Sequence, residues 1–229
     1  MKKLHLILSL PSGIVITIIC LTGALMSVDE YVRPIWPAWE GIYRNLMFLH
    51  RWLLFSDRPL GRLIVGVSTV FLIIILISGL IIWLPKKWSK LKNNLLIKRK
   101  TKFNRRLYDL HRVLGVYSML LLLVLCFTGL MWSFEGYRST AFKIFKIDSV
   151  PERVAIVHRT DKATGEKVKL DFNEMPNDRK VMRWAYLLHT GRWGGWFGPL
   201  LTGTAALIGA SLPITGYVMF YRRMRRRKK

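Results

Sequence analysis

Four of the five histidines in this 229-residue chain occupy matched positions in two halves of the sequence. Neutral imidazole is a common metal ligand, and polar side chains at membrane depth tend to have a function. A matched set of histidines therefore favours a metal or cofactor site over four separate packing roles. The four residues are His5, His50, His111 and His189.

An internal repeat produces this match. His5 aligns with His111, and at the same offset of 106 residues the Cys-x-Thr-Gly stretch at 20–23 aligns with 126–129. Unrelated apolar helices share leucine and isoleucine freely, but they rarely share such a motif at one spacing. A second, looser match has an offset of 139 residues and relates His50 to His189.

Composition places the repeat in a membrane. Apolar residues make up 52% of the chain, and 37 Lys and Arg against 13 Asp and Glu give a net charge of +24. The apolar residues and the charges form separate blocks, and four blocks reach the roughly 20 residues that cross a hydrocarbon core as a helix. We expect an all-α membrane protein, a single membrane domain over 1–229. The predicted spans are 6–28, 63–84, 113–134 and 199–221.

The basic residues predict the orientation. Ten Lys and Arg lie between Lys86 and Arg106 and seven between Arg222 and Lys229, whereas 12 of the 13 acids lie in the loops 29–62 and 135–192. By the positive-inside rule, both termini and the loop 85–109 are cytoplasmic. Bases that flank membrane spans are attracted to anionic lipid head groups, so we expect contact with lipid and no nucleic-acid binding.

The first span resembles a secretory signal peptide only superficially. Its apolar run exceeds the roughly 7 to 15 residues of such a signal. It also has a copy later in the chain, so we expect it to be retained.

Two helix pairs that cross the membrane in the same sense are related by a pseudo-twofold axis along the membrane normal. Equivalent residues then face each other, which pairs His5 with His111 on the cytoplasmic side and His50 with His189 on the opposite side. Interfacial packing of the four rings is one alternative. A structural zinc site usually has four nitrogen or sulfur ligands, whereas a haem iron needs only two axial imidazoles from facing helices.

Arginines stand close to three of these histidines. Arg51, Arg112 and Arg192 are candidates for binding haem propionates, because a guanidinium donates two parallel hydrogen bonds to a carboxylate. Arginine at this depth also extends toward lipid head groups, and this alternative stays open.

Three short motifs resemble the PepSY-associated transmembrane family. They are Leu-His-Arg-Trp-Leu at 49–53, Leu-His-Arg-Val-Leu-Gly at 110–115 and Leu-His-Thr-Gly at 188–191. The resemblance implies a bacterial inner-membrane protein with two b-type haems, similar to ferric-siderophore reductases. Its haem ligands would be the same four histidines.

The loop 135–192 departs from the longer family members, which carry a PepSY domain there. Here the loop has 58 residues, and alternating residues at 154–159 and 167–172 predict a small β-hairpin. His158 lies in this hairpin without a repeat partner, and we expect it to be solvated.

The expected activity is one-electron transfer across the membrane. A cytoplasmic quinol, flavin or flavoprotein would be the donor, and a ferric chelate or siderophore in the periplasm would be the acceptor and substrate. Two alternatives stay open: a cytochrome b-like subunit of another complex, and a non-enzymatic scaffold or transport accessory. The sequence contains no nucleophile motif, acid-base dyad or phosphate loop.

Overall fold

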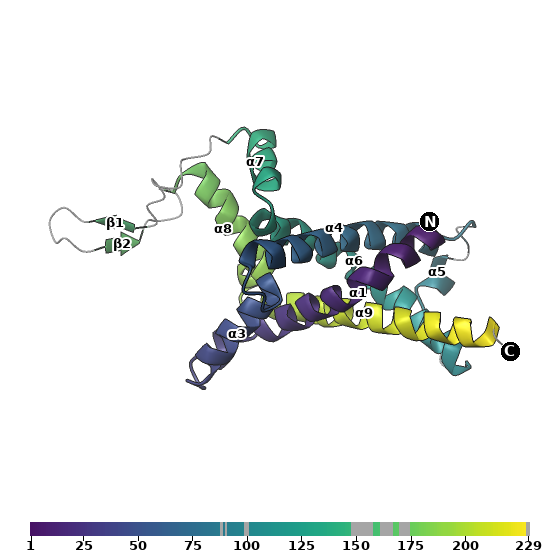
Figure 1. Cartoon of the computed structure of the whole chain (residues 1–229). Helices are drawn as coiled ribbons and strands as arrows, with labels where there is room; N and C mark the ends of the chain where they lie inside the picture. The colour runs from purple at the N-terminus through teal and green to yellow at the C-terminus, as the bar shows by residue number, and fades with distance from the viewer. Residues whose placement is uncertain are drawn as a thin grey trace.

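The computed structural model describes residues 1–87, 89, 91–98, 101–147, 158–160, 167–169 and 175–227. Four long helices run side by side in this part of the chain (Figure 1). Each is long and apolar enough to cross a membrane. They are α1 (Lys2–Met26), α4 (Arg58–Trp83), α6 (Phe103–Ser133) and α9 (Phe197–Arg227).

All four helices are longer than the predicted spans, and three of them extend well beyond an end of the span. α4 begins at Arg58, α6 begins ten residues before the predicted span at 113, and α9 continues to Arg227. At 1.5 Å per residue, the 31 residues of α6 or α9 extend about 46 Å, against a hydrocarbon core of about 30 Å. Backbone hydrogen bonds can continue a helix beyond the membrane into water, where charged side chains are favourable. The end of an apolar stretch in the sequence therefore does not mark the end of the helix.

The four helices form a ring. α1 packs against α4 and α9, and α6 packs against the same two helices. α1 and α6 therefore stand at opposite corners. The ring is filled in its middle by apolar side chains from all four helices, among them Ile16, Leu72, Leu122 and Ala210.

Two further helices repeat one arrangement. α3 (Trp39–Trp52) precedes α4 and packs on α1, whereas α8 (Asn177–Thr190) precedes α9 and packs on α6. Both lie at the end of the ring opposite the two chain termini (Figure 1). We call this the distal end, and the end with both termini the terminal end.

The remaining described elements are short. They are α2 (Asp29–Val32), α5 (Leu91–Asn94), α7 (Glu135–Ile144), the 3-10 turn η4 (Arg192–Gly194), β1 (His158–Thr160) and β2 (Lys167–Lys169). β1 and β2 pair antiparallel, with His158 opposite Lys169. The predicted strands were longer, and the rest of 154–159 and 167–172 lies outside the described residues.

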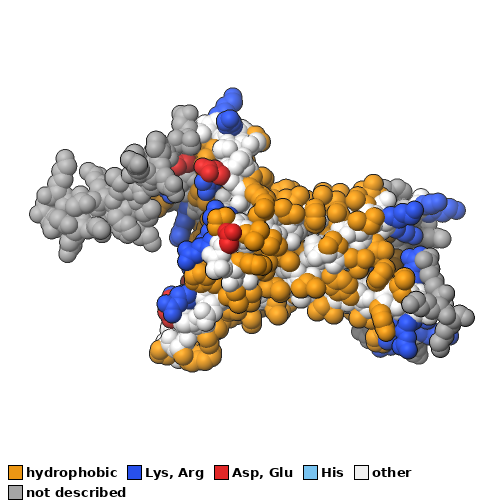
Figure 2. All heavy atoms as spheres, in the orientation of Figure 1, with side chains coloured by type: hydrophobic (Ala, Val, Ile, Leu, Met, Phe, Trp, Pro, Cys, Tyr) orange, Lys and Arg blue, Asp and Glu red, His pale blue; other side chains and the backbone are white. Residues whose placement is uncertain are grey.

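Charge separates the two ends of the molecule. Figure 2 shows an apolar surface around the middle of the long helices, Lys and Arg at the terminal end, and acids together with bases at the distal end. The chain is thus a membrane protein with four candidate spanning helices.

Asp29 joins the two halves at the distal end. Its carboxylate is 4% exposed and accepts hydrogen bonds from Arg33 (3.1 and 3.0 Å), from Trp39 (2.9 Å) and from Arg192 (3.0 Å). Arg192 lies in the connection between α8 and α9, in the other half of the chain. Breaking a buried ion pair leaves an unpaired charge, so this contact stabilises the pairing of the halves at the level of the distal histidines.

Candidate functional site

Two pairs of histidines face each other inside the molecule. The rings of His5 on α1 and His111 on α6 have centroids 6.4 Å apart and cross at 79° near the terminal end. At the distal end, His50 on α3 and His189 on α8 have centroids 6.1 Å apart and cross at 68°. The structure thus brings together both pairs that the repeat relates. Ligation of iron by these rings stays a prediction.

At the terminal pair, Nδ1 of each imidazole contacts a hydroxyl of the neighbouring helix. Nδ1 of His5 lies 3.0 Å from Oγ of Ser78 and 3.1 Å from the carbonyl oxygen of Ile75. Nδ1 of His111 lies 2.8 Å from Oγ1 of Thr215. Ser78 and Thr215 are on α4 and α9, the helices that follow the two copies of the repeated first span.

The distal pair repeats this contact on the other two helices of the ring. Nδ1 of His50 lies 3.0 Å from Oγ1 of Thr22, and Nδ1 of His189 lies 3.0 Å from Oγ1 of Thr128. The carbonyl oxygen of Leu125 is also 3.0 Å from Nδ1 of His189. All four imidazoles are therefore held through the same ring atom.

These contacts fix the tautomer of the rings. A hydroxyl has one proton, and Thr22 donates it to the carbonyl oxygen of Ile18 at 2.8 Å. A carbonyl oxygen can only accept, and Nδ1 of His5 and of His189 each lies next to one, at 3.1 and 3.0 Å, so Nδ1 carries the proton in these rings. Each of the other three hydroxyls likewise contacts a carbonyl of its own helix; the shortest of these distances are Ser78 to Ile75 3.0 Å, Thr128 to Val124 2.6 Å and Thr215 to Leu212 2.9 Å.

Protonation of Nδ1 leaves the lone pair on Nε2, which is how metal-ligating histidines are commonly oriented. Burial, as the main cause, lowers the pKa of both His50 and His189 to about 4. Both rings are therefore neutral at pH 7, which is the form that binds metals.

A glycine follows each of the four hydroxyl residues and makes room for the ring. A Cβ on Gly129 would lie 3.1 Å from Cε1 of His189, and one on Gly23 would lie 3.3 Å from Cε1 of His50. Gly79 meets His5 in the same way, at 3.3 Å. We call the Ser/Thr-Gly pair the seat of the imidazole. Its hydroxyl contacts Nδ1, and its glycine has no side chain that would occupy the space of the ring edge.

The separation of the rings fits one metal ion between them. A metal–imidazole bond is about 2 Å long and the nitrogen lies about 1.1 Å from the ring centre, so two rings on opposite sides of one ion have centroids about 6.2 Å apart. Both observed separations, 6.4 and 6.1 Å, are close to this value. Within the described residues, no group of three or more His, Cys, Asp or Glu could hold a metal ion.

A cavity surrounds the terminal pair. Its volume is about 410 Å³, residues of all four long helices line it, and both His5 and His111 are among them. This volume lies within the range of cofactor and small-molecule sites. Small residues and three cations contribute to its wall: Gly13, Gly79, Gly115, Gly216, Lys2, Arg112 and Arg223. An apolar cavity with cations suits a flat macrocycle with carboxylates at one edge.

Comparison with protein families decides the classification. Residues 32–223 match the model of the PepSY-associated TM region. The chain belongs to this family. The match includes His50, His111 and His189, whereas His5 precedes it, so the assignment of His5 depends on the repeat and on its geometry. Neither the curated proteins nor the solved structures contain a match to the chain.

The three predicted arginines of this PepSY-associated TM protein differ in their surroundings. Arg112 lines the cavity and also contacts Asp109 at 3.4 Å and Asn94 at 2.7 Å. Arg192 binds Asp29, as described above. The guanidinium of Arg51 lies 4.8 Å from the ring centroid of Trp52. Acids thus bind two of the three arginines.

Sequence reasoning missed Lys2 and Arg223 as cavity residues. Both belong to clusters of basic residues near the termini, and the sequence analysis assigned these clusters to contact with lipid head groups. It also missed the role of the four hydroxyls. Thr-Gly or Ser-Gly occurs eight times in the sequence, so the pair alone was not a sufficient signal. Four of the eight pairs, at 22–23, 78–79, 128–129 and 215–216, seat an imidazole.

Replacement of Thr22 by valine tests this seat. Valine has the shape of threonine but cannot accept the proton of Nδ1 of His50. We expect the affinity of the distal site for haem to fall about tenfold, at the lower end of the effects seen when partners of metal ligands are removed. Thr204→Val is the matched control, because Thr204 is exposed and its hydroxyl binds only its own helix, at Leu200. Equal haem retention by both variants in a transfer assay to apomyoglobin would contradict this role.

Proposed function

We propose that this PepSY-associated TM protein is a di-haem b protein that moves electrons across the bacterial inner membrane. His5 and His111 would hold one haem, and His50 and His189 the second. One observation carries the proposal: in both pairs, Nδ1 contacts a hydroxyl while the two rings face each other with centroids 6.4 and 6.1 Å apart.

The residues of the chain have three tasks in this proposal. The Ser/Thr-Gly seats orient the imidazoles before a cofactor binds. The apolar core around Ile16 and Leu122, which are 1% and 2% exposed, keeps water from the space between the two sites. The cations that line the terminal cavity would neutralise the carboxylates of the cofactor bound there. A haem held by these histidines would supply a one-electron redox centre.

The charge distribution supports an orientation with the terminal end in the cytoplasm. The basic surface lies at the end with both termini, and the acids gather at the distal end (Figure 2). The distal pair would then lie on the periplasmic side. The donor would be a cytoplasmic quinol, flavin or flavoprotein. The family resemblance supports a ferric chelate, such as a ferric siderophore, as the periplasmic acceptor.

Anaerobic mixing tests the reductase function. The dithionite-reduced protein, freed of excess reductant, is mixed with ferric chelates while the haem α band is followed. We expect reoxidation together with appearance of ferrous iron, trapped by a ferrous-specific dye. The gallium(III) complexes of the same chelators are the control, because they match in charge and shape but cannot be reduced under these conditions. Absence of reoxidation by every ferric chelate would contradict the reductase and favour an electron-transfer subunit of another complex.

A further inference from the structure

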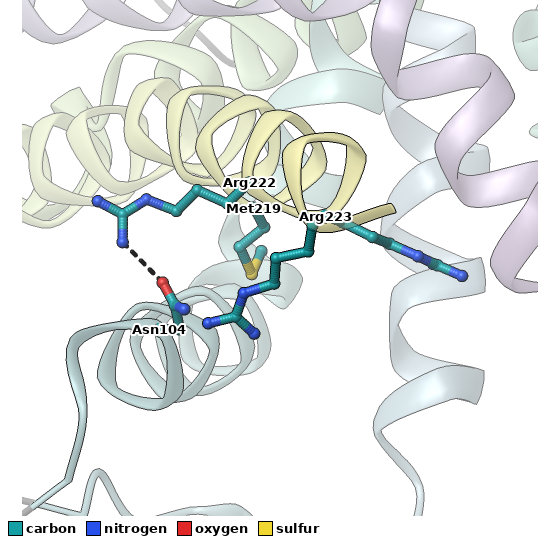
Figure 3. Close-up of a pocket in the computed structure, with 5 residues that line it drawn as sticks. Asn104, Met219, Arg222 and Arg223 are labelled. Atoms are coloured by element: carbon teal, nitrogen blue, oxygen red, sulfur yellow. Dashed lines mark hydrogen bonds between the residues drawn. The ribbon is translucent and has the colours of Figure 1, made fainter. Parts of the chain in front are cut away.

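A second hollow lies at the terminal end, between the start of α6 and the end of α9 (Figure 3). Its volume is about 270 Å³, and its lining residues are Asn104, Met219, Arg222, Arg223 and Arg226. Three of these five residues are arginines, so the hollow presents a concentrated positive charge. Neither the histidine pairs nor the predicted propionate partners account for Arg222 and Arg226.

One arginine of this hollow is held in place. Arg222 donates a hydrogen bond of 2.7 Å to the side-chain oxygen of Asn104, which Figure 3 shows between the two helices. Its guanidinium also lies 4.4 Å from the ring centroid of Phe103. A guanidinium restrained in this way loses less conformational entropy when it binds an anion.

Among the described residues, neither Asp nor Glu lines the hollow. The sequence contains no Asp or Glu in 1–28, in 58–108 or in 197–229. The one acid of this end, Asp109, is fully buried and contacts Arg105 at 3.2 Å and Arg112 at 3.4 Å. The positive charge of this cluster therefore suits an anionic ligand.

The chemistry of the lining residues points to phosphate. Guanidinium groups bind phosphate through paired, charge-assisted hydrogen bonds, and the side-chain amide of Asn104 adds a neutral donor. A hollow of about 270 Å³ is smaller than most sites that enclose a whole small molecule. It suits the phosphate end of a larger ligand whose remaining part lies outside.

The position of the hollow favours a redox cofactor as the carrier of that phosphate. Met219 and Arg223 line both this hollow and the cavity that contains His5 and His111. A ligand held by Arg222 would therefore lie next to the cavity that contains this histidine pair. A quinol has no charge for the arginines to bind, whereas a flavin mononucleotide carries one phosphate at the end of a flexible chain.

We propose that Asn104, Arg222 and Arg226 form a phosphate-binding site for a mononucleotide-type redox cofactor such as flavin mononucleotide. Its use as electron donor rests on the proposed function, but its binding does not. Anionic lipid head groups carry the same phosphate chemistry, and the experiment below separates the two sources.

Equilibrium dialysis of the full chain in phosphatidylcholine nanodiscs measures the binding. We expect saturable binding of flavin mononucleotide, competition by inorganic phosphate, and at least about tenfold weaker binding of riboflavin, which lacks the phosphate. Arg222→Gln and Arg226→Gln should each weaken binding about tenfold. Arg225→Gln is the matched control, because Arg225 is exposed on the same segment but does not line the hollow, and its effect should stay within about twofold.

Asn104→Asp gives a variant that keeps the contact with Arg222 but repels phosphate. Its binding of flavin mononucleotide should fall while its melting temperature is kept. In a second arm, phosphatidylglycerol retained by the purified protein is measured by native mass spectrometry. Retention that is lost in Arg222→Gln, without flavin mononucleotide binding, would keep the phosphate site but contradict the mononucleotide ligand.

Two results would overturn the site altogether: equal affinity for flavin mononucleotide and riboflavin, or no dependence of either phosphate ligand on Arg222 and Arg226. Binding is measured without regard to haem content. A haem-containing protein that binds no phosphate ligand would contradict this inference alone. A haem-free protein that binds flavin mononucleotide would contradict only the proposed function.

Discussion

Replacement of His111 by alanine is expected to remove one haem from the protein and leave the second in place. The variant lacks one axial ligand of the terminal site, whereas His50 and His189 lie on α3 and α8 at the other end of the ring. The haem content, measured as the pyridine haemochrome, should fall from about two to about one per chain.

Double variants make this prediction sharper. His5→Ala combined with His111→Ala should still contain about one haem, because both changes affect one site. His50→Ala combined with His111→Ala should contain none, because each change affects a different site. His158→Ala, which changes the histidine without a repeat partner, is the control and should retain both haems. One haem in the His50/His111 double variant would contradict the pairing.

Replacement of Gly198 by alanine is expected to disrupt the distal site without touching a ligand. A Cβ on Gly198 would overlap the carbonyl oxygen of Gly191, and Gly191 itself has a φ of +78° in the turn that ends α8. The start of α9 and the end of α8 are therefore in direct backbone contact. Alanine must push them apart, and His189 lies only two residues before Gly191.

We expect Gly198→Ala to lose the distal haem, to keep the terminal haem and to lose roughly 1 to 3 kcal/mol of stability, as when a side chain is forced into a filled space. Gly194→Ala is the matched control, because nothing lies within 4 Å of a Cβ at Gly194 and it belongs to the same connection. Haem content and melting temperature report the two effects. Identical behaviour of the two variants would contradict the role of this backbone contact.

The repeat in the sequence was sufficient to predict which histidines face each other in space. His5 and His111 occupy equivalent positions of two helices with the same direction, so their pairing follows from symmetry. The four long helices could be predicted for a similar reason, because burial in lipid demands uncharged stretches of a fixed minimum length. The helix ends could not, because charged residues continue a helix into water.

The contacts of the arginines could not be predicted from the sequence. Arg192 binds Asp29 across a separation of 163 residues, and nothing in the local sequence of either residue indicates the other. The contacts of the imidazoles depend on how each helix is rotated about its own axis. The mean hydropathy of a span does not indicate this rotation. The cavity at the terminal pair likewise depends on the packing of four helices, so Arg223 and Lys2 acquire their place only in the folded chain.

The absorption spectrum of the purified, folded protein tests the central claim most directly. The account predicts a Soret band, a split α band after reduction, and about two low-spin haems per chain with two histidine ligands each. A colourless protein from cells that are replete in haem, with its melting transition intact, would contradict it.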